Sequence, residues 1–359
     1  MTSTGARRRV RERVRAVTER DVTRLRQQVL DILREVVPYD AHIWLLTDPV
    51  TTVGAAPHAV VPCLPELPAL IKSKYLTTLN RWTAQPSTTA TLYRSTHGDL
   101  SQSRSWRDVT SRYDLRDALS TVLKDQFGLW GFLELWRIAP SEPFSAADEE
   151  MLAELAPILT TLVREAQAAT FRPDAVAQRQ DLGPVVLTLD DDLRVLSRTA
   201  ASQVWLDLLL PPGEAGRAVP ASVYNVAAQL LAHEQGVDGH PAYSRTHLGQ
   251  GLWLTLRAAR IAGEHQQDGT IVVTMQEASA SDRLEVYALA VGLTTRERQL
   301  LDRLARGANT RAIASAMDVS ENTVQDHLKA IFSKTGARDR IGVLAQALGT
   351  RGTNGTMET

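Results

Sequence analysis

Residues 293–336 read LTTRERQLLDRLARGANTRAIASAMDVSENTVQDHLKAIFSKTG, and the spacing of their apolar side chains predicts three successive helices. Thr294 and Glu297 have the Thr-x-x-Glu spacing of a capping box, which predicts the start of the first helix. Gly307 is the expected residue just beyond its end. A short second helix is expected at about 310–317, followed by a tight turn into the third.

The third helix, capped by Ser320, is predicted to have two different faces. Val324, Leu328 and Ile331 follow at spacings of four and three residues and form its apolar face. At about 100° per residue, polar side chains fall on the opposite face. Two short helices joined by a tight turn, the second exposing polar side chains, are typical of a helix-turn-helix. A fourth helix is expected at 338–348, with these residues inward: Ile341, Leu344 and Leu348.

The polar face of the third helix supplies candidate readers of DNA bases: Asn322, Gln325, Asp326 and Lys329. Glutamine pairs well with adenine and lysine with guanine, while aspartate can accept a hydrogen bond from cytosine. An acid on this face is also repelled by phosphates. The alternative for Asp326 is therefore a tolerated bystander that reads no base.

Three further residues lie nearer the helix ends, where DNA phosphates pass: Thr323, Lys334 and Arg338. We expect them to hold the DNA backbone. The alternatives are a local backbone hydrogen bond for Thr323, and solvated helix-end cations for Lys334 and Arg338.

The segment closely resembles the LuxR-type helix-turn-helix over about 55 residues without gaps. The matching positions are Leu293-Thr294, Arg296-Glu297, Gly307, Ile313-Ala314, Val319-Ser320, Thr323-Val324, His327-Leu328, Ile331, Lys334 and Gly336. The resemblance implies an all-α four-helix domain whose partner is double-stranded DNA. Two positions depart from the family: Asp318 stands where the turn usually has glycine, and Gln325 where lysine is common.

Composition limits what the rest of the chain can be. A length of 359 residues suggests two to three domains, and a single cysteine excludes a disulfide framework and any multi-cysteine zinc site. The formal net charge is −1, so DNA binding must depend on local basic patches. Residues 1–36 hold ten arginines against five acidic residues. No apolar stretch is long enough for a signal peptide or a membrane helix, so we expect a cytoplasmic protein without membrane contact.

Upstream, the sequence resembles two sensory domain types. A strand, a polar loop, a Phe144-Ser145 cap and a leucine-rich helix between Gly131 and Val163 resemble the end of a GAF domain. The predicted order of a hairpin, helices and further antiparallel strands over 184–277 resembles a PAS domain. In particular, 252–261 and 270–275 are expected to pair as a hairpin.

The predicted fold class is therefore multidomain, with α+β GAF-like and PAS-like sensory domains followed by the all-α four-helix domain. The expected boundaries are a basic N-terminal helix at 1–37, a GAF-like domain at 38–168, a linker at 169–183, a PAS-like domain at 184–277, a linker helix at 278–292, the helix-turn-helix at 293–349 and a disordered tail at 350–359. The apolar seam of the first helix and a helix at 148–164 are candidate dimer elements. Three tryptophans favour an apolar ligand pocket in the GAF-like domain: Trp44, Trp130 and Trp136.

These features predict a homodimeric, sequence-specific transcriptional regulator. RNA polymerase and a small-molecule ligand are further candidate partners. No Walker loop, dinucleotide fingerprint or nucleophile elbow occurs, so we expect no enzyme, no catalytic residue, no cofactor and no metal site. The alternative, favoured only by Asp326, is a dimerisation scaffold with a degenerate helix-turn-helix.

Overall fold

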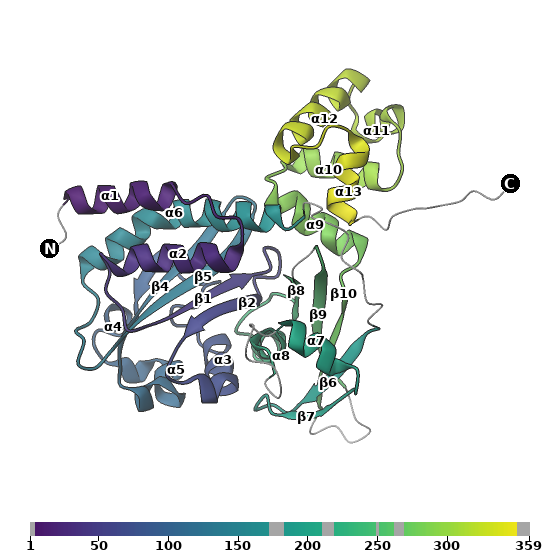
Figure 1. The fold of residues 1–359 in the computed structure, drawn as a ribbon. Helices are drawn as coiled ribbons and strands as arrows, with labels where there is room; N and C mark the ends of the chain where they lie inside the picture. The colour runs from purple at the N-terminus through teal and green to yellow at the C-terminus, as the bar shows by residue number, and fades with distance from the viewer. Residues whose placement is uncertain (1–3, 172–182, 210–218, 249–250, 262–268, 350–359) are drawn as a thin grey trace.

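The computed structural model describes residues 4–171, 183–209, 219–248, 251–261 and 269–349. Figure 1 shows two domains built on antiparallel sheets, a connecting helix and a C-terminal helical domain. The coarse architecture predicted from the sequence is therefore confirmed, while the finer GAF-like and PAS-like assignments stay predictions. No helix in the described ranges is both long and apolar enough to cross a membrane.

The first domain has a five-stranded sheet in the order β2-β1-β5-β4-β3. Its strands are β1 (Ala41–Thr47), β2 (Gly54–Val60), β3 (Thr89–Thr91), β4 (Leu115–Asp125) and β5 (Gly128–Ile138). Helices α1 (Thr4–Arg15), α2 (Val22–Arg34) and α6 (Ala146–Ala169) cover one face. Helices α3 (Leu67–Tyr75), α4 (Leu92–Ser95) and α5 (Arg104–Asp108) lie on the other side. As predicted, Ser145 caps α6, and Asp148 completes a capping box with it.

The prediction of one continuous helix over 1–37 is wrong. The side chain of Asp21 accepts hydrogen bonds from the backbone N–H groups of Thr23 and Arg24, which starts α2 as a second helix after a break. The apolar residues of α1 and α2 are buried in the same core cluster as the apolar face of α6. The apolar residues of the predicted seam and of α6 therefore pack against each other within one subunit, and their role as dimer elements stays a prediction.

The basic N-terminus is matched by a row of glutamates on α6. Three ion pairs join the two: Arg7 with Glu150, Arg11 with Glu154 and Arg20 with Glu165, at 3.2, 3.9 and 2.8 Å. These pairs give the arginine run a structural use in holding the N-terminal helices to the first domain.

The second domain repeats the strand order of the first, as β7-β6-β10-β9-β8. Its strands are β6 (Val185–Leu189), β7 (Val195–Arg198), β8 (Tyr243–His247), β9 (Trp253–Arg260) and β10 (Ile271–Glu277), and its helices are α7 (Ser202–Leu209) and α8 (Ala221–Glu234). The pairing of β9 with β10 confirms the predicted hairpin. Of the predicted linker, 172–182 lies outside the described residues, as does the predicted tail at 350–359.

The two sheet domains meet in a shared hydrophobic cluster. Trp82 and Phe132 of the first domain belong to the same buried cluster as Val223 and Leu254 of the second. A buried polar contact joins them too, because the Arg81 guanidinium is paired with Asp238 at 3.2 Å. A shared cluster of this kind makes the two domains a single packed unit.

The predicted apolar pocket is not lined by the three tryptophans, because Trp44, Trp130 and Trp136 are each at most 1% exposed and packed into the core. A cavity of about 20 Å³ in this domain is instead lined partly by polar side chains, among them Lys74 and Ser103. A cavity of that size holds a water molecule or two. The apolar ligand pocket therefore stays a prediction, without these tryptophans as its lining.

The C-terminal part begins with the connector helix α9 (Ala280–Ala290), close to the predicted linker helix. Four helices follow: α10 (Thr295–Ala305), α11 (Thr310–Met317), α12 (Glu321–Thr335) and α13 (Arg340–Leu348). They form a compact bundle that rests on α9, apart from the two sheets (Figure 1).

Candidate DNA-binding surface

Local capping fixes the ends of the helices in the C-terminal bundle. Thr294 and Glu297 form the predicted capping box of α10, and the Ser320 hydroxyl accepts from the backbone N–H of Thr323 to start α12. Asp318 ends α11 in the left-handed conformation with φ of 54°, which aspartate tolerates better than most residues. The turn that joins α11 to α12 is therefore formed without the usual glycine.

The buried side of the bundle agrees with the predicted apolar stripe except in its last helix. Val324, Leu328 and Ile331 are each at most 1% exposed. In α13, Val343 is buried, whereas Ile341 is 78% exposed, so the inward placement of Ile341 is wrong. Two residues correspond to about 200° of helix rotation, which places Ile341 opposite Val343.

The polar face of α12, which is predicted to enter a DNA groove and is called the groove face below, is open to solvent. Asn322, Gln325, Asp326 and Lys329 are all exposed and recur at three- and four-residue spacings, so the structure places them on one side of the helix. Within that group, Lys329 Nζ pairs with Asp326 Oδ1 at 3.1 Å, and both side chains are about three-quarters exposed. A base that engages Lys329 must compete with this exposed and therefore weak ion pair.

The three residues predicted to hold phosphates are placed differently from one another. Thr323 is half-buried and its hydroxyl lies 2.9 Å from that of Ser320, so it takes part in the helix cap. Arg338 lies in the loop between α12 and α13, is exposed, and makes no polar contact with the other residues that the structure describes. Its guanidinium therefore remains available to a phosphate.

Lys334 is partly exposed, but its ammonium is bound to the start of the bundle. Its ammonium donates to Glu297 Oε2 at 2.6 Å and to the carbonyl of Gly292 at 3.1 Å. Burial pushes the pKa of Glu297 upward, but hydrogen bonds from Lys334 and Thr294 outweigh burial and hold that pKa below its usual value. The lysine thus ties the end of α12 to the start of α10, and this geometry does not favour a phosphate contact.

We expect Lys334→Ala to lower the free energy of unfolding of the C-terminal bundle by about 1–3 kcal/mol, because the buried carboxylate of Glu297 loses its charged partner. This expected loss of free energy is smaller than the loss for a fully buried ion pair, since the Lys334 side chain is 34% exposed. Denaturant unfolding followed by a probe in this domain measures it. Lys329→Ala is the matched control, and equal stability of the two variants would contradict the assignment.

Sequence reasoning identified Glu297 only as a capping residue. Its second role, as partner of Lys334, depends on a contact between residues 37 positions apart. The hydrogen bond from Arg340 to the hydroxyl of Thr310 is another long-range tie, between α13 and α11, and was missed as well. Neither pair has a local sequence signal.

The C-terminal bundle matches a known family model. Residues 291–346 match the model described as "Bacterial regulatory proteins, luxR family". The predicted LuxR-type helix-turn-helix is thereby confirmed for this part of the chain.

Relatives with similar segments are all named as regulators. A probable HTH-type transcriptional regulator, GfsR of Streptomyces halstedii, is 32% identical over 90 residues, covering 25% of this chain and 37% of its own. The probable transcriptional regulatory protein NarL of Mycobacterium tuberculosis is 37% identical over 69 residues, 19% of this chain and 32% of its own. The chain thus spans about a third of the length of these relatives, and none of the named relatives is an enzyme, in line with the prediction.

Among solved structures, SdiA of Escherichia coli aligns with 96% of this chain and 96% of its own, at 14% sequence identity and a TM-score of 0.32. A TM-score this low supports no argument about the arrangement of the domains.

Proposed function

Because residues 291–346 form a LuxR-type helix-turn-helix domain, we propose that the chain is a sequence-specific DNA-binding regulator of transcription. The observation that carries the proposal is the free polar face of α12, held rigidly by a capped and buried scaffold. Such a helix fits the major groove, where base pairs have distinct hydrogen-bonding patterns. A protein with this role works in the cytoplasm, with the chromosome and RNA polymerase.

Within this proposal the exposed residues of α12 divide into two roles. Gln325 and Lys329 read bases, with Asn322 at the start of the helix and Asp326 as a reader or a bystander. Arg338 contacts a phosphate, and Thr323 donates to one if its hydroxyl leaves the cap. Genome-wide mapping of the sites that the full chain binds tests the proposal. Recovery of a shared motif supports it, and random coverage of the genome contradicts it.

The alternative function, a dimerisation scaffold that has lost DNA binding, is favoured only by the acid at position 326. The pairing of Asp326 with Lys329 weakens that argument, because part of the acid's charge is compensated on the same helix. Absence of salt-dependent binding to any genomic DNA would favour the scaffold.

We further propose that the regulator is a homodimer, since one helix-turn-helix of this size reads a single short half-site. Ile341 is the candidate contact with a second copy, because at 78% it is the most exposed large apolar side chain in the described ranges. The two sheet domains form the body that carries the DNA-binding domains. The cavity in the first domain, which is lined by both polar and apolar side chains, has room for a very small ligand.

We expect a dimeric mass for the full chain by light scattering at micromolar concentration. Ile341→Ser should shift that mass toward the monomer, because it removes the apolar contact. Ile261→Ser is the matched control, as Ile261 is 56% exposed at the end of β9, and it should leave the dimer intact. A monomeric mass for the unaltered chain, with and without DNA, would exclude the homodimer.

A further inference from the structure

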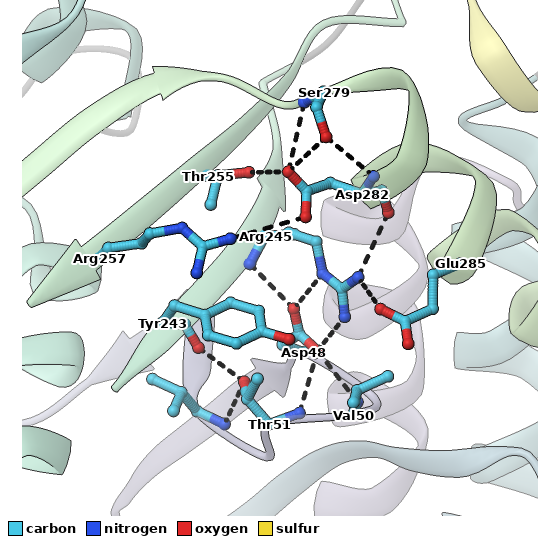
Figure 2. Close-up of polar contacts among 11 residues, drawn as sticks. Asp48, Val50, Thr51, Tyr243, Arg245, Thr255, Arg257, Ser279, Asp282 and Glu285 are labelled. Atoms are coloured by element: carbon cyan, nitrogen blue, oxygen red, sulfur yellow. Dashed lines mark hydrogen bonds and ion pairs between the residues drawn. The ribbon is translucent and has the colours of Figure 1, made fainter. Parts of the chain in front are cut away.

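One buried carboxylate and one buried guanidinium join the two sheet domains. Asp48, at the end of β1, is 0% exposed, and Arg245, in the middle of β8, is 2% exposed. Arg245 Nε and Nη2 donate to the two carboxylate oxygens of Asp48 at 2.7 and 2.8 Å, and the backbone N–H of Arg245 donates to Oδ2 at 3.0 Å (Figure 2). This bidentate fork fixes the orientation of the arginine.

The Asp48 carboxylate also accepts hydrogen bonds from the β1–β2 turn in which it lies. Asp48 Oδ1 also accepts from the backbone N–H groups of Val50 and Thr51, at 2.9 and 3.1 Å. The Thr51 hydroxyl in turn donates to the carbonyl of Tyr243 at 2.7 Å, beside Arg245 on β8 (Figure 2). The β1–β2 turn of the first domain and β8 of the second therefore move together.

The free arm of the same guanidinium reaches the connector. Arg245 Nη1 donates to Glu285 Oε2 at 2.5 Å and to the carbonyl of Asp282 at 3.3 Å, and both residues belong to α9 (Figure 2). Burial opposes the charge of Arg245, but the hydrogen bonds and charges of Asp48 and Glu285 outweigh it and raise the pKa of the guanidinium. The arginine thus stays charged while it contacts three parts of the chain at once.

The connector in turn carries the DNA-binding domain. The Tyr287 hydroxyl on α9 donates to Gln346 Oε1 on α13 at 2.8 Å, and Lys334 donates to the carbonyl of Gly292 just beyond α9. At this same C-terminal end of α9, Arg164 of α6 donates to the carbonyl of Ala290 at 3.1 Å. The position of the DNA-binding domain relative to the sheets therefore depends on how α9 is held.

The two arms of Arg245 differ in strength. The fork to Asp48 is buried, whereas the Glu285 side chain is 51% exposed and joined at one oxygen. An exposed single contact is much weaker than a buried bidentate one. The bond to Glu285 is therefore the one that can break while both sheet domains stay folded.

We propose that Arg245 couples the packed pair of sheet domains to the DNA-binding domain through α9, and that loss of its bond to Glu285 loosens the helix. Arg257, Thr255 and Arg164 also contact α9, so the helix stays attached while the DNA-binding domain shifts. Because the fork to Asp48 holds the arginine fixed between the two sheet domains, a shift of α9 away from the sheets is what breaks the bond to Glu285. The consequence for DNA affinity rests on the proposed function, whereas the mechanical coupling does not.

Hydrogen–deuterium exchange of the full chain tests the coupling without DNA. In Glu285→Ala we expect backbone exchange to be roughly tenfold faster in α9 and also in α13, which Glu285 does not touch, with β1 and β8 unchanged. Glu285→Gln should stay near the unaltered chain, because its amide oxygen still accepts from Arg245.

Glu234→Ala is the matched control, since it removes a glutamate–arginine pair, with Arg260, that lies away from α9. It should leave exchange in α9 and α13 unchanged. Exchange in Glu285→Ala that rises in α9 alone, or in neither helix, would overturn the coupling. A chain that binds no specific DNA but passes the exchange test would sink the proposed function and leave the coupling intact.

Discussion

Asp48→Ala is expected to lower the free energy of unfolding of the sheet-domain pair by about 3–5 kcal/mol. The substitution leaves the Arg245 guanidinium, only 2% exposed, without its bidentate partner. It also removes the acceptor of two backbone N–H groups in the β1–β2 turn. The guanidinium keeps only the half-exposed Glu285 as a charged partner. Loss of its buried partner costs far more than the loss of an exposed ion pair, because water cannot replace that partner.

Urea unfolding of the full chain measures this loss. Asp192→Ala is the matched control, because Asp192 is paired with Lys72 at 2.7 Å but its side chain is 59% exposed. That control should cost less than about 1 kcal/mol. Equal losses for the two variants would mean that the contact between the domains is not the buried fork described above.

The second large effect is expected at the groove face. Lys329→Ala should lose roughly 1–3 kcal/mol of binding free energy at the mapped site and relax the preference at one base position. The reason is that lysine reads the acceptors of guanine, which alanine cannot. Equilibrium binding to the mapped site and to its single-base variants measures both effects. Unchanged specificity would remove Lys329 from the base readers.

Asp326→Ala separates the two roles left open for the acid. A bystander that only repels phosphates would, once removed, tighten binding to all DNA. A reader of cytosine would, once removed, weaken binding to the mapped site while random DNA gains. The variant also frees Lys329 from its ion pair, so the comparison includes the double variant, in which any effect of the pair is absent.

The C-terminal domain could be predicted almost completely because its signals are local. Capping residues such as Thr294 and Ser320, and apolar residues such as Val324 and Leu328 at helical spacing, act within one or two turns of helix. Ile341 shows the limit of that approach. In a short helix, the spacing of leucines and isoleucines is compatible with more than one choice of buried face. The structure buries the face that contains Val343, and Ile341 lies on the opposite face.

The contacts between domains could not be predicted in the same way. Asp48 and Arg245 are 197 positions apart, and the sequence around either residue contains no pattern that indicates the other as its partner. The apolar seam of the first predicted helix could be recognised from its spacing, but no sequence pattern indicates that α6 of the same chain covers it. Periodicity identifies a buried face, whereas the identity of the partner depends on the tertiary fold.

The most direct test of the central claim compares the affinity of the full chain for its mapped site and for a shuffled sequence of the same length, over a range of salt. A sequence-specific regulator should bind the site about a thousandfold or more tightly than the shuffled DNA at physiological salt. Its affinity for both should fall steeply as salt rises, because phosphate contacts release counterions. Equal affinity for the two DNAs, or no binding to either, would contradict the account.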